Sequence, residues 1–242
     1  MLPTRLPYLF VVGAVVLVPP VTEADSILWY NGDLPSGGGT VNEEASNIGS
    51  ARVFENFDVT APGGWLIQSV WSNDSMQFQG VTSAYWSIRS GMSAGNAGTI
   101  IGSGTALATQ TATGRFNASL LFPEYTIQVS GLSLYLPPGQ YWLCVSPVVG
   151  SDPISNGTLK SYASVTFGAN AIGTPAGNDG GGFLYWPYGG YNYAPSLFNQ
   201  DYSLGISGIT VVPEPSIWAL ATTAGVFFLL VRLHNRCPDA RD

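Results

Sequence analysis

Hydrophobic and polar residues alternate in short runs along residues 25–212, and no run keeps the spacing of an amphipathic helix. The runs are rich in β-branched and aromatic residues, and glycine, proline and asparagine separate them. This pattern predicts an all-β domain, an antiparallel and jelly-roll-like β-sandwich. The expected strands occupy residues 26–30, 51–60, 65–71, 83–89, 98–104, 125–129, 132–136, 140–145, 161–167, 182–186 and 202–212.

Two of these runs indicate where the core lies. Residues 140–145 are apolar at both parities, which predicts a central strand that is buried on both faces. In residues 51–60, Phe57 and Val59 share one parity and are expected in the core, whereas Glu55 of the same parity is expected at an edge or strand end.

Other runs show where strands break and which way they face. Residues 65–71 are expected to be apolar on the face of Trp65, Ile67 and Trp71. Proline and glycine at residues 62–64 and 137–139 predict sharp breaks in the chain.

Charge excludes one class of partner. Residues 25–212 contain eleven acidic and four basic side chains, an excess of seven negative charges without a basic stripe. Such a surface does not displace counterions from phosphates, so nucleic acid is not expected as a partner. Uncharged polar residues would keep this domain soluble.

Hydrolytic chemistry lacks its usual residues. The one histidine, His234, lies outside residues 25–212, which excludes a Ser-His-Asp or Cys-His relay and the common zinc sites there. A glycosidase needs only two carboxyl groups, which Glu55, Asp58, Asp74 and Glu124 could supply at an unknown separation. We therefore expect no enzyme and no cofactor.

No metal site is expected either. Residues 177–182 are typical of a flexible turn, with too few oxygen side chains for calcium. Asp152, Asp179 and Asp201 can converge in space, but nothing in their spacing requires it. Cys144, in an apolar run, is expected to be a small buried hydrophobe.

Residues 185–193 form the strongest candidate for ligand binding. Trp186, Tyr188, Tyr191 and Tyr193 offer aromatic faces against which sugar C–H groups can pack, and their polar groups can bond sugar hydroxyls. The alternative is a glycine and proline loop that folds its own aromatic side chains over the edge of the domain.

The N-terminus has the pattern of an export signal. Arg5 supplies a positive charge, residues 6–18 are mainly apolar, and Thr22 and Ala24 are small residues at the positions that a signal peptidase reads. Cleavage is expected after Ala24, giving a signal peptide of residues 1–24. An uncleaved signal anchor is the alternative.

The C-terminus combines three signals. Pro213, Glu214 and Pro215 form a stiff extended segment, residues 216–231 are an apolar run near the shortest length that spans a bilayer, and Arg232 and Arg236 follow. The positive-inside rule places these arginines in the cytoplasm and the β-domain outside. An ordinary membrane anchor behind a proline linker is the alternative.

This order of motif, apolar helix and basic tail resembles the PEP-CTERM sorting signal of bacterial surface proteins. The resemblance covers residues 211–242 and implies Pro213, Glu214 and Pro215 as the recognition motif, with Arg232 and Arg236 as the cytoplasmic stop. It also implies cleavage by a membrane-embedded exosortase in bacteria that make exopolysaccharide. The basic residues are more widely spaced here than is usual in that family.

The β-domain, residues 25–210, looks like the bodies of secreted proteins that carry this signal and have no assigned function. The likeness rests on runs such as residues 54–59, 64–70, 86–89 and 136–143. It implies an exported component of the cell surface or extracellular matrix with a structural or interaction role. A carbohydrate-binding module is the alternative, and a glycoside hydrolase is the third reading.

Overall fold

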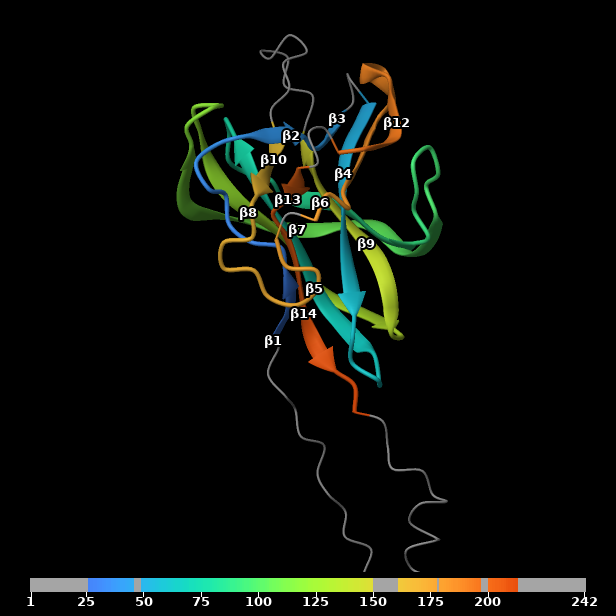
Figure 1. Ribbon diagram of the computed structural model, residues 1–242. Coiled ribbons are helices and arrows are strands. Elements are labelled where there is room, and N and C mark those ends of the chain that lie inside the picture. The colour runs from blue at the N-terminus through green and yellow to red at the C-terminus, as the bar shows by residue number, and fades with distance from the viewer. Residues whose placement is uncertain (1–25, 46–48, 150–160, 178, 197–199, 213–242) are drawn as a thin grey trace, which may run out of the picture.

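The structure is a computed structural model that describes residues 26–45, 49–149, 161–177, 179–196 and 200–212. The described part is almost entirely β, as expected, and its one helical element is the short 3-10 turn η1 (Pro187–Gly189). No helix in this part is long and apolar enough to cross a membrane. The strands, shown in Figure 1, are β1 (Ser26–Tyr30), β2 (Gly39–Val41), β3 (Glu43–Ala45), β4 (Gly49–Val59), β5 (Trp65–Met76), β6 (Ser83–Ser90), β7 (Thr99–Asn117), β8 (Phe122–Leu136), β9 (Gly139–Val149), β10 (Ser161–Thr166), β11 (Phe183–Trp186), β12 (Tyr191–Pro195), β13 (Asp201–Tyr202) and β14 (Leu204–Thr210).

Hydrogen bonds connect the strands into one continuous path, β1-β14-β5-β8-β7-β6-β9-β3-β4-β11-β12. Neighbouring strands are antiparallel except for the short parallel pair of β3 with β9. The long strand β7 divides this path into two halves, β1-β14-β5-β8 and β6-β9-β3-β4-β11-β12. It links them, because its first part pairs with β6 and its second part with β8. β10 lies beside β5, β2 and β13, off the main path.

The main core lies between these halves. β9 pairs with β6 on one side and β4 on the other, and its residues 141–147 are buried, which confirms the expected central strand. Phe57 and Val59 face the main core as expected, and Phe57 stacks on Trp65 with ring centroids 6.1 Å apart.

A second hydrophobic cluster lies on the other face of the β4, β6 and β9 strands. Phe54, Trp142 and Cys144 belong to it, whereas the neighbouring residues Val53, Tyr141, Leu143 and Val145 face the main core. Strand side chains alternate between faces, so this cluster is separated from the main core by the sheet itself. Cys144 is wholly buried, as expected, and burial strongly raises the pKa of its thiol.

A bulge corrects the expected facing of β5. Between Ile67 and Ser69 the register against β8 shifts, so the parity of the side chains changes along the strand. Val70 therefore faces the core, and Trp71 lies on the opposite face against Tyr30. Residues 125–129 and 132–136 belong to the single strand β8, which continues through this irregularity, rather than to two strands.

Two further expectations about these strands are wrong, and three strands were not predicted. Glu55 lies in the middle of β4 opposite Leu143 and is completely buried, instead of at an edge or end. β7 continues to Asn117, far beyond residue 104. This part was not predicted, because its alternating threonine and alanine residues lack the apolar face that marks a strand in the sequence. The unpredicted strands are β2 and β3, which have only three residues each, and β12, which begins in the aromatic run that was interpreted as a loop.

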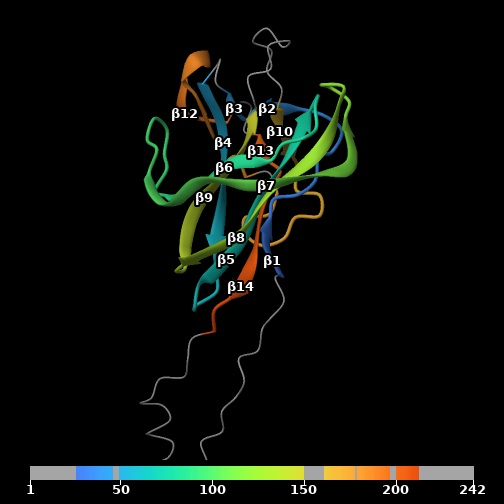
Figure 2. The ribbon, with the colours of Figure 1, turned by 180° about the vertical axis from the view of Figure 1, so that it is seen from behind.

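The two ends of the described chain lie together. β1 pairs with β14, and Ser26 is opposite Gly208. Figures 1 and 2 show that β1 and β14 reach the same pole of the molecule, whereas β12 and η1 lie at the opposite pole. We call the segment formed by β11, η1 and β12 the aromatic tip.

Candidate functional site

The aromatic tip contains the candidate carbohydrate-binding residues. β11 and β12 form a hairpin in which Trp186 is opposite Tyr191, and these two rings stack with centroids 6.2 Å apart and an interplanar angle of 12°. Tyr188 of η1 projects into solvent with 76% of its surface exposed. Of these three rings, that of Tyr188 is free, and those of Trp186 and Tyr191 contact each other.

Tyr193 belongs to a separate stack on the outer face of the sheet. Its ring lies 4.8 Å from that of Tyr185, and the Arg52 guanidinium lies 3.8 Å from the centre of the Tyr85 ring and 5.8 Å from that of Tyr185. Cations over aromatic faces are attracted by the ring quadrupole. Arg89 stands in the same way over Phe54 and Tyr193.

The four residues expected to form one platform therefore have different surroundings. Trp186 and Tyr191 pack against the main core, and Tyr193 packs against the second hydrophobic cluster. Tyr188 is the most exposed of the four. The Trp186 indole N–H is buried without a hydrogen-bond partner. The loop therefore packs three of these aromatic rings against the domain and leaves the Tyr188 ring in solvent.

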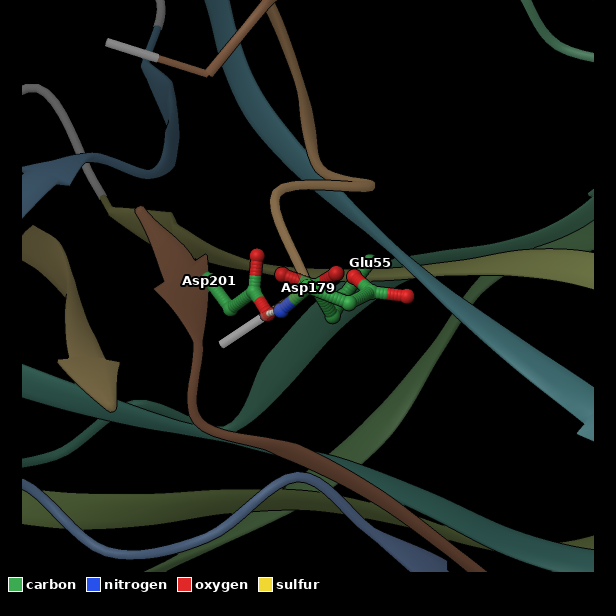
Figure 3. A group of neighbouring side chains, drawn as sticks. All are labelled: Glu55, Asp179 and Asp201. Atoms are coloured by element: carbon green, nitrogen blue, oxygen red, sulfur yellow. Dashed lines mark hydrogen bonds between the residues drawn. The ribbon is translucent and has the colours of Figure 1, made fainter. Parts of the chain in front are cut away.

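Three carboxyl groups meet beside the middle of β4. Glu55 comes from β4, Asp179 from the loop before β11, and Asp201 from β13. One carboxylate oxygen from each lies within 4.8 Å of the others, and Figure 3 shows the three groups gathered together. Glu55 and Asp201 are buried, whereas Asp179 is exposed. We call these residues the acidic triad.

Backbone N–H groups hold the acidic triad in place. The Glu55 carboxylate accepts hydrogen bonds from the Tyr202 N–H at 2.7 Å and the Asn56 N–H at 3.1 Å. Asp201 accepts from the N–H groups of Asp179 at 2.6 Å and Gly180 at 3.0 Å, so it fixes the loop that carries Asp179. These contacts fix the orientation of the Glu55 and Asp201 carboxyl groups.

Burial and like charge both act on the triad. Burial, followed by repulsion from Asp201, raises the pKa of Glu55 well above its ordinary value. Burial also raises the pKa of Asp201 to about 6, against the lowering effect of the Asp179 N–H, with the Asp179 charge adding to the increase. A positive charge placed among these oxygens would relieve both costs.

Asn56 adds an amide group at the rim of the triad. Its Nδ2 donates to Asp179 Oδ2 at 3.0 Å, and its Oδ1 is buried without a hydrogen-bond partner. The side chain is only 3% exposed. An unsatisfied buried oxygen costs roughly 1 to 3 kcal/mol.

Part of this cluster can be predicted from the sequence. Asp179 and Asp201 were expected as residues that can converge, and the structure brings them together, whereas Asp152 lies outside the described residues. Glu55 was named from the sequence only as a possible carboxyl group for glycoside cleavage, and it was expected at a strand edge or end rather than beside Asp179 and Asp201. The available signal was a charged residue at a core parity between Val53 and Phe57, since a buried carboxylate needs partners.

The other carboxyl groups considered for glycoside cleavage are separate from the triad. Asp74 and Glu124 are wholly buried, and Glu124 is bound to Arg115. Asp58 is partly buried, and burial followed by the Asp179 charge raises its pKa. Fully buried carboxyl groups cannot contact a polymer, so the Asp74 and Glu124 side chains offer no glycosidase pair in this conformation.

An open groove of about 410 Å³ lies elsewhere, between the loop after β5 and the middle of β7. The Gln110 amide closes one side, since its oxygen accepts from the N–H groups of Gly80 and Val81. The groove is separate from both the aromatic tip and the acidic triad. Its lining residues are Gln79, Gly80, Val81, Ala108, Thr109, Gln110, Ala112 and Tyr125.

The sorting motif Pro213, Glu214 and Pro215, the arginines Arg232 and Arg236, and the N-terminal signal lie outside the described residues. No family model, curated protein or solved structure matches the chain.

Proposed function

We propose that this chain is an exported component of the cell surface or extracellular matrix, sorted and cleaved by an exosortase-type enzyme. In this proposal a signal peptide directs export, and residues 216–231 anchor the precursor in the inner membrane. The β-domain, an antiparallel jelly-roll-like sandwich, has a structural or interaction role associated with exopolysaccharide or other matrix proteins. The motif of Pro213, Glu214 and Pro215 followed by an apolar run and arginines motivates it.

The chain ends and the aromatic tip lie at opposite poles of the domain, and this arrangement supports the proposal. Ser26 and Gly208 are paired neighbours, so the segments before β1 and after β14 attach at one pole. The aromatic tip lies at the other pole (Figure 1). A domain tethered through its C-terminal segment would therefore present this tip away from the membrane, which suits an interaction role at a surface.

The test follows the mass and location of the protein in its own host. With the native motif, we expect a product that lacks both terminal segments and is found at the surface or in the matrix. With Pro213, Glu214 and Pro215 all changed to alanine, we expect a longer form held in the inner membrane.

A matched control changes Val211 and Val212 to alanine and leaves the motif intact. This variant should be processed like the native chain. If the native and triple-alanine chains both remain uncut in the membrane, the motif is only a linker and the proposal is wrong.

A carbohydrate-binding module is the second candidate, and the exposure of Tyr188 favours it. A solvent-facing tyrosine beside the Trp186 and Tyr191 stack offers apolar area and a hydroxyl to a sugar ring. Affinity electrophoresis in glucan or in native exopolysaccharide should then retard the protein. Tyr188→Ala should remove the retardation, and Phe167→Ala, which removes another exposed ring, should keep it.

A further inference from the structure

One face of the strands β14, β5, β8 and β7 is turned away from the main core. Val70, Val129 and Ile206 of these strands belong to that core, and Ala108 packs against it. Because strand side chains alternate between faces, their neighbours in sequence point outward. We call this surface the Trp71 face. Its residues that reach solvent are Trp71, Thr109, Gln128, Ser130 and Ser207.

Cross-strand pairing sets four positions of this face in one straight row. Thr109 lies opposite Gln128, and Gln128 lies opposite Trp71. Trp71 in turn lies opposite Gly205. The four strands can be followed side by side in Figure 2. Adjacent strands are about 4.8 Å apart, so the row from β7 to β14 is roughly 14 Å long. This length suits several linked rings of an extended polymer.

Gly205 allows the Trp71 indole to lie over β14. A Cβ at Gly205 would come within 2.8 Å of three indole atoms, Cζ2, Cε2 and Cη2. A residue without a side chain therefore leaves room for the ring at this position. The Tyr30 ring, 6.0 Å from the indole between centroids, lies beyond it on β1. The indole is held against the sheet and stays partly exposed, as a surface on which sugar C–H groups can pack.

Hydroxyl and amide groups border the indole. Gln128 donates from its amide to Ser69 Oγ at 3.1 Å, and Ser69 Oγ lies 2.6 Å from Ser207 Oγ. An amide side chain has two N–H donors and an acceptor oxygen, so this bond orients Gln128 and leaves it further capacity for a ligand. Thr109 and Ser130 add exposed hydroxyl groups beside it.

Charge selects among the polymers that such a face can bind. The five solvent-reaching residues of the Trp71 face are uncharged, although residues 25–212 carry an excess of seven negative charges. Arg115, the charged residue of β7, is paired with Glu124, the charged residue of β8. The excess charge repels an acidic polymer, and a cationic partner would meet no carboxylate among these five residues. An uncharged chain therefore fits best.

We propose that the Trp71 face binds an extended, uncharged polysaccharide of β-1,4-linked pyranose rings. Such a chain is a flat ribbon, so one ring can pack on the Trp71 indole while its neighbours bond to Gln128 and Thr109. A coiled polymer, such as an α-linked glucan, would leave the straight row after one ring. This inference rests on the interaction role proposed for the β-domain, and it depends neither on export nor on the aromatic tip.

Calorimetric titration with cellohexaose tests the site on the purified full-length chain, in a detergent whose head group is not a sugar. We expect a dissociation constant of about 1 mM or tighter. Maltohexaose has α linkages, and hexamannuronate has the same β-1,4 linkage with a carboxylate on each ring. Both should bind roughly tenfold more weakly than cellohexaose. Native electrophoresis in hydroxyethyl cellulose should retard the protein.

Thr109→Glu is the main variant, because this side chain is exposed and lies outside the core. It places a larger, charged group in the row and should weaken cellohexaose binding about tenfold. Thr105→Glu is the matched control. It makes the same change at an exposed position on the same face of β7, roughly 13 Å along the strand, and should keep the dissociation constant within about threefold.

Two other variants separate the possible binding surfaces. Trp71→Ala should abolish retardation in hydroxyethyl cellulose, and Tyr188→Ala at the aromatic tip should preserve it. Melting curves establish that each variant is folded. If Trp71→Ala unfolds, Thr109→Glu still decides the question.

Three results would overturn the inference. They are cellohexaose binding weaker than about 1 mM, unchanged affinity in a folded Thr109→Glu variant, and maltohexaose or hexamannuronate binding as tight as that of cellohexaose. Loss of binding in Tyr188→Ala but not in Thr109→Glu would place the glycan at the aromatic tip instead. Sorting is measured separately in the host, so a failure of this site and a failure of the sorting proposal give different results.

Discussion

Arg115 donates from Nε to Glu124 Oε2 at 2.5 Å, and this contact joins an arginine side chain that is 30% exposed to a glutamate side chain with no exposure. The same arginine also pairs with Asp33 at 2.7 Å, and Asp33 accepts a hydrogen bond from the Tyr30 hydroxyl at 2.6 Å. The negative charge of the buried Glu124 side chain is thus paired with Arg115, a cation that is partly exposed at the surface.

Removing that cation should destabilise the domain strongly. We expect Arg115→Met to lower the free energy of unfolding by roughly 3 to 5 kcal/mol, because it leaves the Glu124 charge buried and unpaired. Urea unfolding at neutral pH measures the loss. The double variant Arg115→Met with Glu124→Gln should recover part of it, and a double variant no more stable than the single one would contradict this explanation.

Asp74 predicts an unusual dependence of stability on pH. It is wholly buried and accepts hydrogen bonds from Asn42 Nδ2 at 2.8 Å, Ser161 Oγ at 3.2 Å and the Ser72 hydroxyl. Burial raises its pKa to about 7, the hydrogen bonds oppose this increase, and Glu124 adds to it. Glu43, which accepts from the Ser161 N–H, and Cys144 are the other titratable groups on this side.

The sign follows from proton binding. The folded state keeps the Asp74 proton up to about pH 7, whereas the unfolded chain releases it near pH 3.8. Between these values the folded state binds more protons, so stability falls as the pH rises, by up to roughly 4 kcal/mol for this group. Asp74→Asn should match the native protein near pH 4 and exceed its stability at pH 8. Equal pH profiles in chemical unfolding would contradict the prediction.

Gly205 gives Trp71 the space to lie across β14. A Cβ atom at Gly205 would come within 2.1 Å of Trp71 Cζ2, in a register where the two residues are directly opposite. Gly205→Ala should therefore displace the indole from Tyr30 and lower the free energy of unfolding by roughly 1 to 3 kcal/mol. Near-ultraviolet circular dichroism should report the displaced ring. Gly104→Ala is the control, because its nearest neighbour lies at 3.6 Å.

In the aromatic tip, Trp186 has a packing role and Tyr188 is exposed to solvent, so the two residues can be tested separately. A Cβ at Gly189 would lie 2.4 Å from the Trp186 ring, so Gly189→Ala should disrupt the stack with Tyr191 and change the tryptophan fluorescence. Tyr188→Ala should leave stability within about 0.5 kcal/mol of the native value, because the ring is exposed. A large loss of stability in Tyr188→Ala would show that this ring has a structural role.

Strands with a strong local pattern could be predicted from the sequence. β1 begins and ends at the expected residues, and β9 is the central strand that its apolar residues predicted. The facing of β5 could not be predicted, because the bulge between Ile67 and Ser69 depends on pairing with β8. The length of β7 is likewise set by two neighbours rather than by its own residues.

The candidate sites differ in the same way. The aromatic tip is contiguous in sequence, so its residues could be named, although their division between two stacks depends on the fold. The acidic triad is assembled from positions 55, 179 and 201, and only the fold brings them together. Glu55 is a carboxylate at a strand position whose parity faces the core, and this is the signal in the sequence that indicates a buried acidic group.

The pairing of β14 has a mechanical consequence. β14 is bonded along its length to β1 on one side and β5 on the other, and it ends at the pole opposite the aromatic tip (Figure 1). A load applied at the tip and resisted by the segment after residue 212 would pull along β14, perpendicular to its ladder of hydrogen bonds. Those bonds would be loaded in shear and would have to break together, so this strand can transmit tension without unzipping.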